Sequence, residues 1–310
     1  MPKWDVLGFG AVAVDDLVYL DHFPAPDSKE PVRDEQRAGG GLAGTALVAA
    51  ARLGVRAAYA GVLGDDDLSH YTIAELEREG VDCTLVRRQE GSGPVHSTII
   101  VDRSTGERTI LHYAARVVPP DESDVTPELI AQCSVLFVDS TVIAAGLLAA
   151  ELAHRAGIPV VADLEHPGAP GVPELSLAAD HLIVGATFAR AVTGEDEPAA
   201  MVRGLHAPGR AATVVTVGDL GCWYAVGAAV LTVHHTPAYT VRAVDTTGCG
   251  DVFHGAYAAA LARGGTVDRA VAVATIAAGL KATQPGGRLG IPDWSTVERV
   301  LVTLHQGRLA

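Results

Sequence analysis

The chain lacks the usual features of disulfide-bonded, zinc-binding and membrane-spanning proteins. Its 310 residues include four cysteines, at positions 83, 133, 222 and 249, and their spacing resembles no set of zinc ligands. We therefore expect reduced thiols and a cytoplasmic protein. Hydrophobic residues make up 48% of the sequence, but no uninterrupted apolar stretch reaches the roughly 18 residues of a membrane span. The first residues show no convincing signal peptide.

Positive charge is also scarce. The chain carries 23 Lys and Arg residues against 37 Asp and Glu residues, which gives a formal net charge of −14, and no basic cluster stands out. Nucleic acids and anionic membranes bind proteins through concentrated Lys and Arg side chains. We therefore expect neither of them as a partner.

What the sequence does contain is a regular alternation of short strand-like runs and alanine-rich helical runs. Such alternation is typical of an α/β fold whose mostly parallel sheet is covered by helices on both faces. Ligands of such sheets bind beyond the C-terminal ends of the strands, where Asp139, Asp163 and Gly218 lie. The predicted strands are Val6–Gly10, Ala57–Gly61, Val135–Asp139, Pro159–Asp163 and Ala212–Val217, and the predicted helices are Ala43–Leu53, Leu68–Glu79, Ile143–Ala156, Val252–Arg263 and Val267–Thr283.

Two segments do not follow this alternation. Apolar residues in Ala11–Leu20 repeat every two positions, and His96–Asp102 with Glu107–Tyr113 form a predicted hairpin around Ser104–Gly106. We expect these strands to form a small β-sheet over one end of the core. Such a flap can exclude water from a reaction site, and a purely structural role is the alternative.

The most informative stretch is Asp245–Tyr257, with the sequence DTTGCGDVFHGAY. Gly248 and Gly250 come just before Asp251, and an apolar helical pattern follows. A glycine-rich turn that opens a helix presents unpaired backbone N–H groups at the positive end of the helix dipole, and these bind anions. A carboxylate beside them can take the proton of a hydroxyl group as the anion is transferred. The stretch therefore predicts phosphoryl transfer to an alcohol.

Two further glycine-rich segments suit the substrates of such a reaction. Ala38–Thr45 has three consecutive glycines before a helix of small residues, so a ligand can approach the backbone closely. We expect this segment to serve the acceptor. Val214–Cys222 is a strand that runs into a Gly-x-x-Gly turn, which suits a nucleotide phosphate or ribose.

Two other patterns are weaker. Gly8–Ala13 matches the G-x-G-x-x-A fingerprint of dinucleotide-binding proteins, but the residues that follow keep a two-residue period, which favours a strand over the required helix. The pairs Glu165-His166 and His234-His235 have no further ligands at a recognisable spacing. We therefore expect no nicotinamide or flavin cofactor and no metal centre at these histidines.

The order and spacing of four motifs resemble the ribokinase-like, or PfkB, carbohydrate kinase family across essentially the whole chain. The motifs are the DTTGCGDVFHGAY run, the glycine triplet, GDD at Gly64–Asp66 and PGGRLGIP at Pro285–Pro292. The segments AGGGLAGTALVAAARLG, GERTILHY and PGGRLGIPD look most similar to the sulfofructose kinase branch, near fructokinases and ketohexokinases. The resemblance implies one kinase domain over residues 1–310, with a three-layer ribokinase-like core and lid strands within residues 11–36 and 95–117.

The resemblance also implies roles for residues of this chain. It implies ATP and Mg²⁺ as co-substrates, with K⁺ as a frequent activator in the family. Asp251 matches the catalytic base, and Gly248, Cys249 and Gly250 match the anion hole. The other matches are Asp15, Gly40 and Gly41 for the sugar, Thr216, Gly218 and Gly221 for the nucleotide, and Asp245 and Thr247 for the monovalent cation.

Two departures from the family pattern concern the sugar and the metal. Thr45 stands where many members carry an Asn that contacts the sugar. Residues 185–188 read Gly-Ala-Thr-Phe, whereas the family has an N-x-x-E motif that is linked to magnesium. Mg²⁺ would then depend on other groups, such as Asp163 or Glu165.

A third departure concerns the charge of the substrate. In the sulfofructose branch a Lys, an Asn and an Arg hold the sulfonate; Lys29 matches the first, but His112 and Thr141 stand at the others. Losing a bidentate Arg weakens the recognition of a sulfonate. This favours a neutral or differently charged sugar, although Lys29 and a protonated His112 could still meet an anion.

These residues predict an ATP-dependent kinase that phosphorylates a primary hydroxyl of a sugar, either a ketohexose or a related, even anionic, sugar. Lys29, Thr45 and His112 join the predicted sugar site. Two alternatives stay open, namely a nucleoside kinase of the same fold and a non-catalytic sugar or nucleotide sensor. Exposed edges of the small sheet invite pairing, so a homodimer through Ala11–Leu20 and His96–Tyr113 is a further hypothesis.

Overall fold

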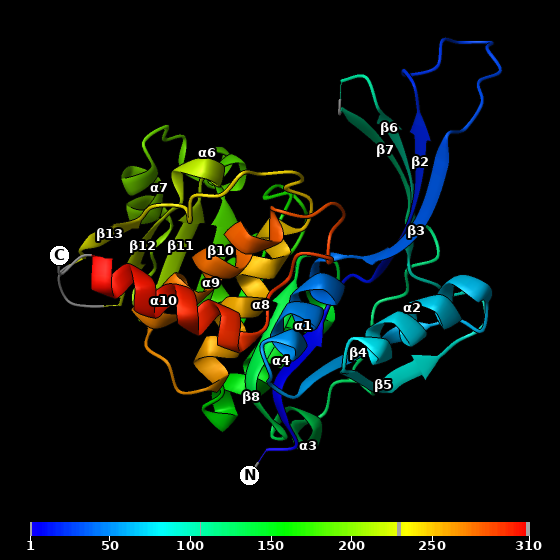
Figure 1. Cartoon of the computed structure of the whole chain (residues 1–310). Coiled ribbons are helices and arrows are strands. Elements are labelled where there is room, and N and C mark those ends of the chain that lie inside the picture. The colour runs from blue at the N-terminus through cyan, green and yellow to red at the C-terminus, as the bar shows by residue number, and fades with distance from the viewer. Residues whose placement is uncertain (1, 106, 228–230, 308–310) are drawn as a thin grey trace.

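The computed structural model describes residues 2–105, 107–227 and 231–307. They form a nine-stranded sheet in the order β13-β12-β11-β10-β9-β8-β1-β4-β5 and a four-stranded sheet in the order β3-β2-β6-β7. Figure 1 shows the large sheet packed among helices and the small sheet projecting beside it. The predicted α/β class, with a large mostly parallel sheet and a separate small one, is confirmed.

The large sheet runs parallel from β5 to β11, and β12 and β13 are antiparallel additions at one edge. The predicted strands agree with the structure to within two residues at each end. They are β1 (Trp4–Phe9), β4 (Ala57–Leu63), β8 (Cys133–Asp139), β9 (Val160–Asp163) and β11 (Ala212–Thr216), and the strands that were not predicted are β5 (Val81–Arg88), β10 (His181–Gly185), β12 (Cys222–Val226) and β13 (Val233–Thr236).

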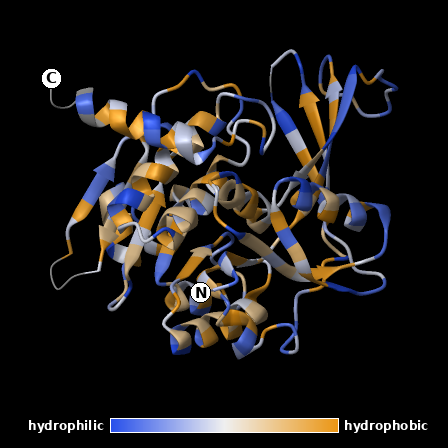
Figure 2. Ribbon diagram, turned by 60° about the horizontal axis from the view of Figure 1, so that its bottom comes forward, coloured by the Kyte–Doolittle hydropathy of each residue, from blue (hydrophilic) through white to orange (hydrophobic). Residues whose placement is uncertain are grey.

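Helices cover both faces of the large sheet and enclose two hydrophobic cores. Neighbouring residues of β1 alternate between them, since Val6 belongs to one core and Leu7 to the other. Figure 2 shows hydrophobic stretches along the sheet and along the helices packed on it. One face carries α1 (Leu42–Arg52), α2 (Asp67–Arg78), α8 (Cys249–Ala262), α9 (Val267–Lys281) and α10 (Trp294–Gly307), and the other carries α3 (Pro127–Ile130), α4 (Ile143–Ala156), α5 (Val172–Ala178), α6 (Ala186–Thr193) and α7 (Pro198–Leu205).

The small sheet consists of β2 (Ala13–Leu20), β3 (Asp34–Gly40), β6 (Val95–Asp102) and β7 (Arg108–Tyr113). The segment after Gly8–Ala13 is therefore a strand, as the two-residue period predicts. The β6–β7 hairpin is also present, although Gly106 of its predicted turn lies outside the described residues. β3 was not predicted, because the glycines at its end carry no strand signal. It extends to Gly40, past residue 36, where the first of the two expected lid segments ends.

Register fixes which side chains of the small sheet share a face. Asp15 of β2 lies opposite Ser97 of β6, and Ser97 lies opposite His112 of β7. Arg108 is on the same face of β7 as His112, because their positions differ by an even number. Arg108 forms an ion pair with Asp245, so this face turns toward the loop that precedes α8. Among the residues that the structure describes, no helix is long and apolar enough to cross a membrane.

Candidate active site

The glycine turn before α8 has the conformation that the sequence predicts. Gly248 is the N-cap of α8 and has φ 73°, in the left-handed region. A Cβ atom at this position would also lie 2.7 Å from the backbone oxygen of Gly287. The helix itself starts at Cys249, three residues before the predicted start at Val252, so the glycine-rich segment forms its first turn.

The first turn of α8 leaves backbone N–H groups available to a ligand. The N–H of Cys249 donates to the carbonyl oxygen of Thr246 at 3.2 Å, so it already has a partner. The N–H groups of Gly250 and Asp251 make no hydrogen bond within the part of the chain that the structure describes. Together with the helix dipole, these two groups form a cradle for an anion. The predicted set was Gly248, Cys249 and Gly250; the N–H of Cys249 is already paired within the chain, and the anion-hole role of the three residues stays a prediction.

Asp251 stands in this turn beside a second acid. Burial, and then the negative charge of Asp163, hold the pKa of Asp251 well above its ordinary value. Asp163 lies at the end of β9 and is only 5% exposed, and burial likewise raises its pKa. Neighbouring carboxylates with raised pKa values are typical of sites that bind cations or transfer protons.

His254 connects this turn to the sheet. Its Nδ1 lies 2.8 Å from the carbonyl oxygen of Gly250 and 3.4 Å from the carboxylate of Asp163. Its Nε2 lies 3.0 Å from the carbonyl oxygen of Ile183 on β10. Burial lowers the pKa of His254, and hydrogen bonds to the two carbonyl groups oppose this effect. The side chain thus fixes the start of α8 relative to the ends of β9 and β10.

A third acid, Asp139, holds the neighbouring segments together. It is fully buried at the end of β8. Its Oδ2 accepts from the N–H groups of Ala11 at 2.7 Å and Ala43 at 3.3 Å, and its Oδ1 accepts from Thr141 at 2.8 Å. Burial raises the pKa of Asp139 to about 6, although these N–H donors oppose the shift. The carboxylate joins the start of the small sheet, the first turn of α1 and the end of β8.

The predicted acceptor residues lie where the small sheet meets α1. Gly41 is the N-cap of α1 with φ 88°, and a Cβ atom there would lie 2.5 Å from the carbonyl oxygen of Ala11. A Cβ atom on Gly40 would lie 2.4 Å from Oδ2 of Asp15. Burial raises the pKa of Asp15, and a hydrogen bond with Ser97 opposes the shift. Asp15 is therefore a neighbour of Gly40, and the sugar-binding role of Asp15, Gly40 and Gly41 stays a prediction.

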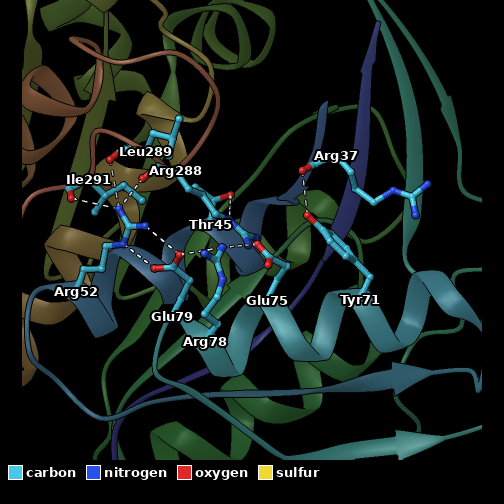
Figure 3. Close-up of polar contacts among 10 residues, drawn as sticks. All are labelled: Arg37, Thr45, Arg52, Tyr71, Glu75, Arg78, Glu79, Arg288, Leu289 and Ile291. Carbon is cyan, nitrogen blue, oxygen red and sulfur yellow. Dashed lines mark hydrogen bonds and ion pairs between the residues drawn. The ribbon is translucent and has the colours of Figure 1, made fainter. Parts of the chain in front are cut away.

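The three other predicted sugar-site residues differ in their positions. His112 occupies the same row of the small sheet as Asp15, two strands away. Lys29 is in the loop between β2 and β3, beyond the paired part of both strands. Thr45 is only 1% exposed, and its hydroxyl oxygen accepts from Nε of Arg288 at 3.3 Å. Figure 3 shows Arg288 reaching from its loop toward Thr45.

A cavity of about 360 Å³ contains the predicted nucleotide turn. Its walls include Thr216, Gly218 and Gly221 together with Cys249 and Gly250 of the α8 turn. The structure therefore brings a strand-end turn and the anion cradle to one cavity. The remaining walls are largely small or apolar and come from residues 238–241, Ala243, Thr246, Phe253, Thr275, Ala278, Gly279 and Ala282, with Asp219 as the charged exception.

Protein donors already occupy the predicted monovalent-cation site. Oδ1 of Asp245 accepts from the N–H of Thr247 at 2.8 Å, its hydroxyl at 2.6 Å and Arg108 at 3.1 Å. Oδ2 accepts from the N–H of Gly286 at 2.8 Å, and the backbone carbonyl of Asp245 accepts from Lys281 at 2.8 Å. With two cationic side chains on Asp245, this donor set does not fit a monovalent cation, and we derive no step through one.

The acids near α8 do fit Mg²⁺ when a nucleotide supplies further ligands. Within the described ranges, no group of three or more His, Cys, Asp or Glu side chains is arranged to hold a metal ion. Mg²⁺ prefers oxygen ligands and usually binds through one or two carboxylates plus substrate phosphates. Asp163 and Glu165 offer such carboxylates. Burial, then the charges of Asp139 and Glu165, raise the pKa of Asp163, and a cation would relieve this repulsion between carboxylates.

Most of the chain matches known proteins. The model of the pfkB family carbohydrate kinases matches residues 5–294. The deoxyribokinase of Salmonella typhi is 27% identical over 301 residues, covering 93% of this chain and 96% of that protein. The probable fructokinase-3 of Arabidopsis thaliana is 32% identical over 245 residues, covering 71% and 68%. A crystal structure from Agrobacterium tumefaciens superposes with a TM-score of 0.89 at 31% identity, covering 98% of this chain and 99% of that chain.

The names of these relatives refer to different sugar substrates. The similarity therefore does not single out the sulfofructose kinase branch that the sequence motifs resemble most. The site also contains residues to which the sequence analysis gave no role, namely His254, Lys281 and Arg288.

Proposed function

Because this chain belongs to the pfkB family carbohydrate kinases, which are phosphotransferases with an alcohol group as acceptor, we propose that it transfers the γ-phosphoryl group of ATP to a primary hydroxyl of a sugar. The acceptor is a ketohexose or a related sugar, including anionic ones. The observation that carries the proposal is the position of the α8 turn. It lines the cavity of the nucleotide turn with Cys249 and Gly250, and it presents Asp251 one residue further on.

In this proposal Asp251 is the catalytic base. The sugar hydroxyl oxygen forms a new bond to the γ-phosphorus, the bond from that phosphorus to the β–γ bridging oxygen breaks, and ADP leaves. The hydroxyl proton moves to the carboxylate of Asp251. A raised pKa suits a group that must hold this proton after transfer. The reaction otherwise depends on positioning and charge stabilisation, because its transition state is loose.

The other residues bind and orient the two substrates. The N–H groups of Gly250 and Asp251 face the transferring phosphoryl group, and such fixed donors stabilise charge that develops in a transition state. Thr216, Gly218 and Gly221 hold the nucleotide. Asp163 and Glu165 would hold Mg²⁺ together with the nucleotide, and the ion would supply positive charge to the phosphates.

The small sheet acts as a lid in this proposal. Its face with Asp15 and Arg108 turns toward the α8 loop, and a cavity of about 610 Å³ lies between the two parts, lined among others by Phe23, Arg108 and Asp245. Closure of the lid on a bound sugar would exclude water, which otherwise competes as phosphoryl acceptor. Asp15 would accept hydrogen bonds from sugar hydroxyls.

The test is ADP production from Mg-ATP with a panel of acceptors. The panel contains fructose, ribose, 2-keto-3-deoxygluconate, sulfofructose, fructose phosphates and nucleosides. We expect acceptor-dependent ADP formation with a sugar, and a loss of about 10²- to 10⁴-fold in kcat for Asp251→Asn. Asp196→Asn, at a 90% exposed side chain in the loop between α6 and α7, is the matched control. Near-normal turnover by Asp251→Asn would remove it from the mechanism.

Two other outcomes would support the alternatives. Turnover with nucleosides only would identify a nucleoside kinase of this fold. Binding of ATP without turnover across the panel would point to a sensor.

A further inference from the structure

Arg288 lies between the two sides of the proposed site. It belongs to the loop between α9 and α10, and its Nη2 donates to the carbonyl oxygen of Gly40 at 2.8 Å. The negative charges of Glu79, Glu75, Asp15 and Asp251, in decreasing order, oppose the effect of burial on its pKa. Asp15 and Asp251 of the proposed site thus act on the guanidinium together with two acids outside that site.

Asp15 and Arg288 flank the same residue, Gly40. Oδ2 of Asp15 approaches the position that a Cβ atom of Gly40 would take, and Arg288 binds its carbonyl oxygen. Nη1 of Arg288 lies beside Gly39, where a Cβ atom would come within 2.3 Å of it. An ionised carboxylate only accepts hydrogen bonds and a guanidinium only donates them. The backbone at Gly40 thus lies between a group that only accepts hydrogen bonds and a group that only donates them.

Thr45 acts through Arg288. Its side chain is buried, and its hydroxyl oxygen accepts from Nε of Arg288 at 3.3 Å. A buried hydroxyl with this partner is poorly placed to contact a sugar. Arg288 is therefore the side chain that can make the contact with the sugar that was predicted for position 45.

The loop that carries Arg288 is anchored from behind by Arg52, as Figure 3 shows. Arg52 forms a bidentate ion pair with Glu79, with N···O distances of 2.7 and 3.0 Å. Its Nη1 also donates to the carbonyl oxygens of Arg288 at 2.7 Å and Ile291 at 3.3 Å. These contacts hold the backbone of Arg288 and leave its guanidinium directed at α1. A preorganised side chain loses less entropy when a ligand binds.

The guanidinium retains capacity to bind a ligand. Burial lowers the pKa of Arg288 to about 10, so the side chain is still charged at neutral pH. Nη2 and Nε donate to Gly40 and Thr45, whereas Nη1 has no hydrogen-bond partner in the described part of the chain. An unused donor near the acceptor side of the site favours an oxygen ligand.

Building on the proposed function, we propose that Arg288 is a specificity-determining residue of the acceptor site. It selects sugars that present a carbonyl or carboxylate oxygen to its guanidinium while Asp15 holds a neighbouring hydroxyl. Such an oxygen offers lone pairs only, which matches a group that can only donate. A carboxylate gains the most, because hydrogen bonds between two charged groups are the strongest.

The test compares acceptors with and without a carboxylate or carbonyl oxygen. Gluconate and 2-keto-3-deoxygluconate carry a carboxylate and the open-chain form of fructose carries a carbonyl, whereas sorbitol and ribitol present hydroxyls alone. We expect the wild type to prefer the first group. Arg288→Gln lowers kcat/KM for that group about 10- to 100-fold, mainly through KM. It leaves the KM of ATP and the polyol values unchanged, and Arg288→Lys restores part of the loss.

Matched variants distinguish the proposed contact of Arg288 with the sugar from the role of Thr45 in holding Arg288. Thr45→Val removes the hydroxyl that accepts from Nε of Arg288 and shifts the same KM values in the same direction, whereas Thr45→Ser keeps that hydroxyl and with it the preference for carboxylate and carbonyl acceptors. Arg155→Gln, an exposed arginine on α4, is the surface control. Equal losses on all acceptors, or no loss on any, would overturn the role of Arg288.

Failure of the proposed function gives a different result. If the wild type forms no ADP with any acceptor, binding of the same compounds is measured by isothermal titration calorimetry without nucleotide. Weaker binding of the carboxylates by Arg288→Gln then supports the inference, and equal binding by both proteins overturns it.

Discussion

The ammonium nitrogen of Lys281 lies 2.8 Å from the backbone carbonyl oxygen of Asp245. The side chain of Lys281 is fully buried, at 0% exposure. Burial lowers its pKa, and the electrostatic effects of Cys249 and Asp245 oppose this. Lysine is almost never fully buried without a partner. This ammonium group therefore supplies a fixed positive charge beneath the turn that leads into α8.

A fixed cation makes a mobile one unnecessary, so we predict activity that is independent of monovalent cations. The wild-type kcat should agree within about twofold in Na⁺ and K⁺ buffers of equal ionic strength. Lys281→Ala removes the ammonium group without adding bulk, and its activity should fall and then recover in part when ammonium or K⁺ is added. A wild type that needs K⁺ would contradict the prediction and restore Asp245 and Thr247 as a cation site.

The raised pKa of Asp251 predicts the shape of the pH profile. A base must be unprotonated, so kcat/KM rises with pH through the raised pKa, at higher pH than an ordinary Asp would give. Asp163→Asn removes the largest charge that raises this pKa and should move the acid limb to lower pH. Since the two carboxylates interact, the limb belongs to the pair. An unmoved limb in this variant would show that Asp163 does not influence the titrating group.

Asp15 and Asp16 provide a matched pair on opposite faces of β2. Asp15 faces the Gly40 side, whereas Asp16 pairs with Arg37 at 2.6 Å and with His96 at 2.8 Å. Asp15→Ala should raise the KM of the sugar about 10-fold or more and leave that of ATP unchanged. Asp16→Ala should leave both KM values unchanged. The assignment of the acceptor site would fail if the sugar KM of Asp15→Ala equalled that of the wild type.

The sequence predicted those helices and strands whose apolar period and end residues lie within or directly beside the element. The helix Ile143–Ala156 was predicted with the bounds it has, because its apolar period ends at Gly157, which adopts the left-handed C-cap conformation. β3 was missed because it ends in glycines, which carry no strand signal. The start of α8 was placed late for a related reason, since glycine is a poor helix former and Gly250 nevertheless lies in the first turn.

The candidate site was predicted as a set of motifs, but not as a set of contacts. Gly40 and Asp251 belong to recognisable motifs and Asp15 matches a family position, and the structure places Asp15 beside Gly40. Arg288 bonds to Thr45, more than 230 positions away, and Lys281 bonds to Asp245, more than 30 positions away. The periodicity of a sequence predicts local elements and does not predict such contacts between distant residues. The arginine in PGGRLGIP was visible, but nothing local showed that it would reach Thr45.

The outer strand of the small sheet predicts how the chain associates. β2 pairs with β3 on one side and β6 on the other, so the predicted dimer contact cannot use an edge of β2. β7 is the free edge that remains from the predicted hairpin, and it exposes Leu111 at 57% and Tyr113 at 55%. An exposed apolar edge strand readily pairs with another strand. Leu111 is on the face opposite His112, so a second copy could cover it without entering the site.

We therefore predict a homodimer through β7, measured by light scattering coupled to size-exclusion chromatography. Leu111→Lys puts a charge on this edge and should give a monomer, because two copies would then bring like charges together. Leu177→Lys changes an equally apolar side chain on α5, 73% exposed, and should leave the dimer intact. A monomeric wild type, or a Leu111→Lys variant that still dimerises, would show that β7 is not the interface.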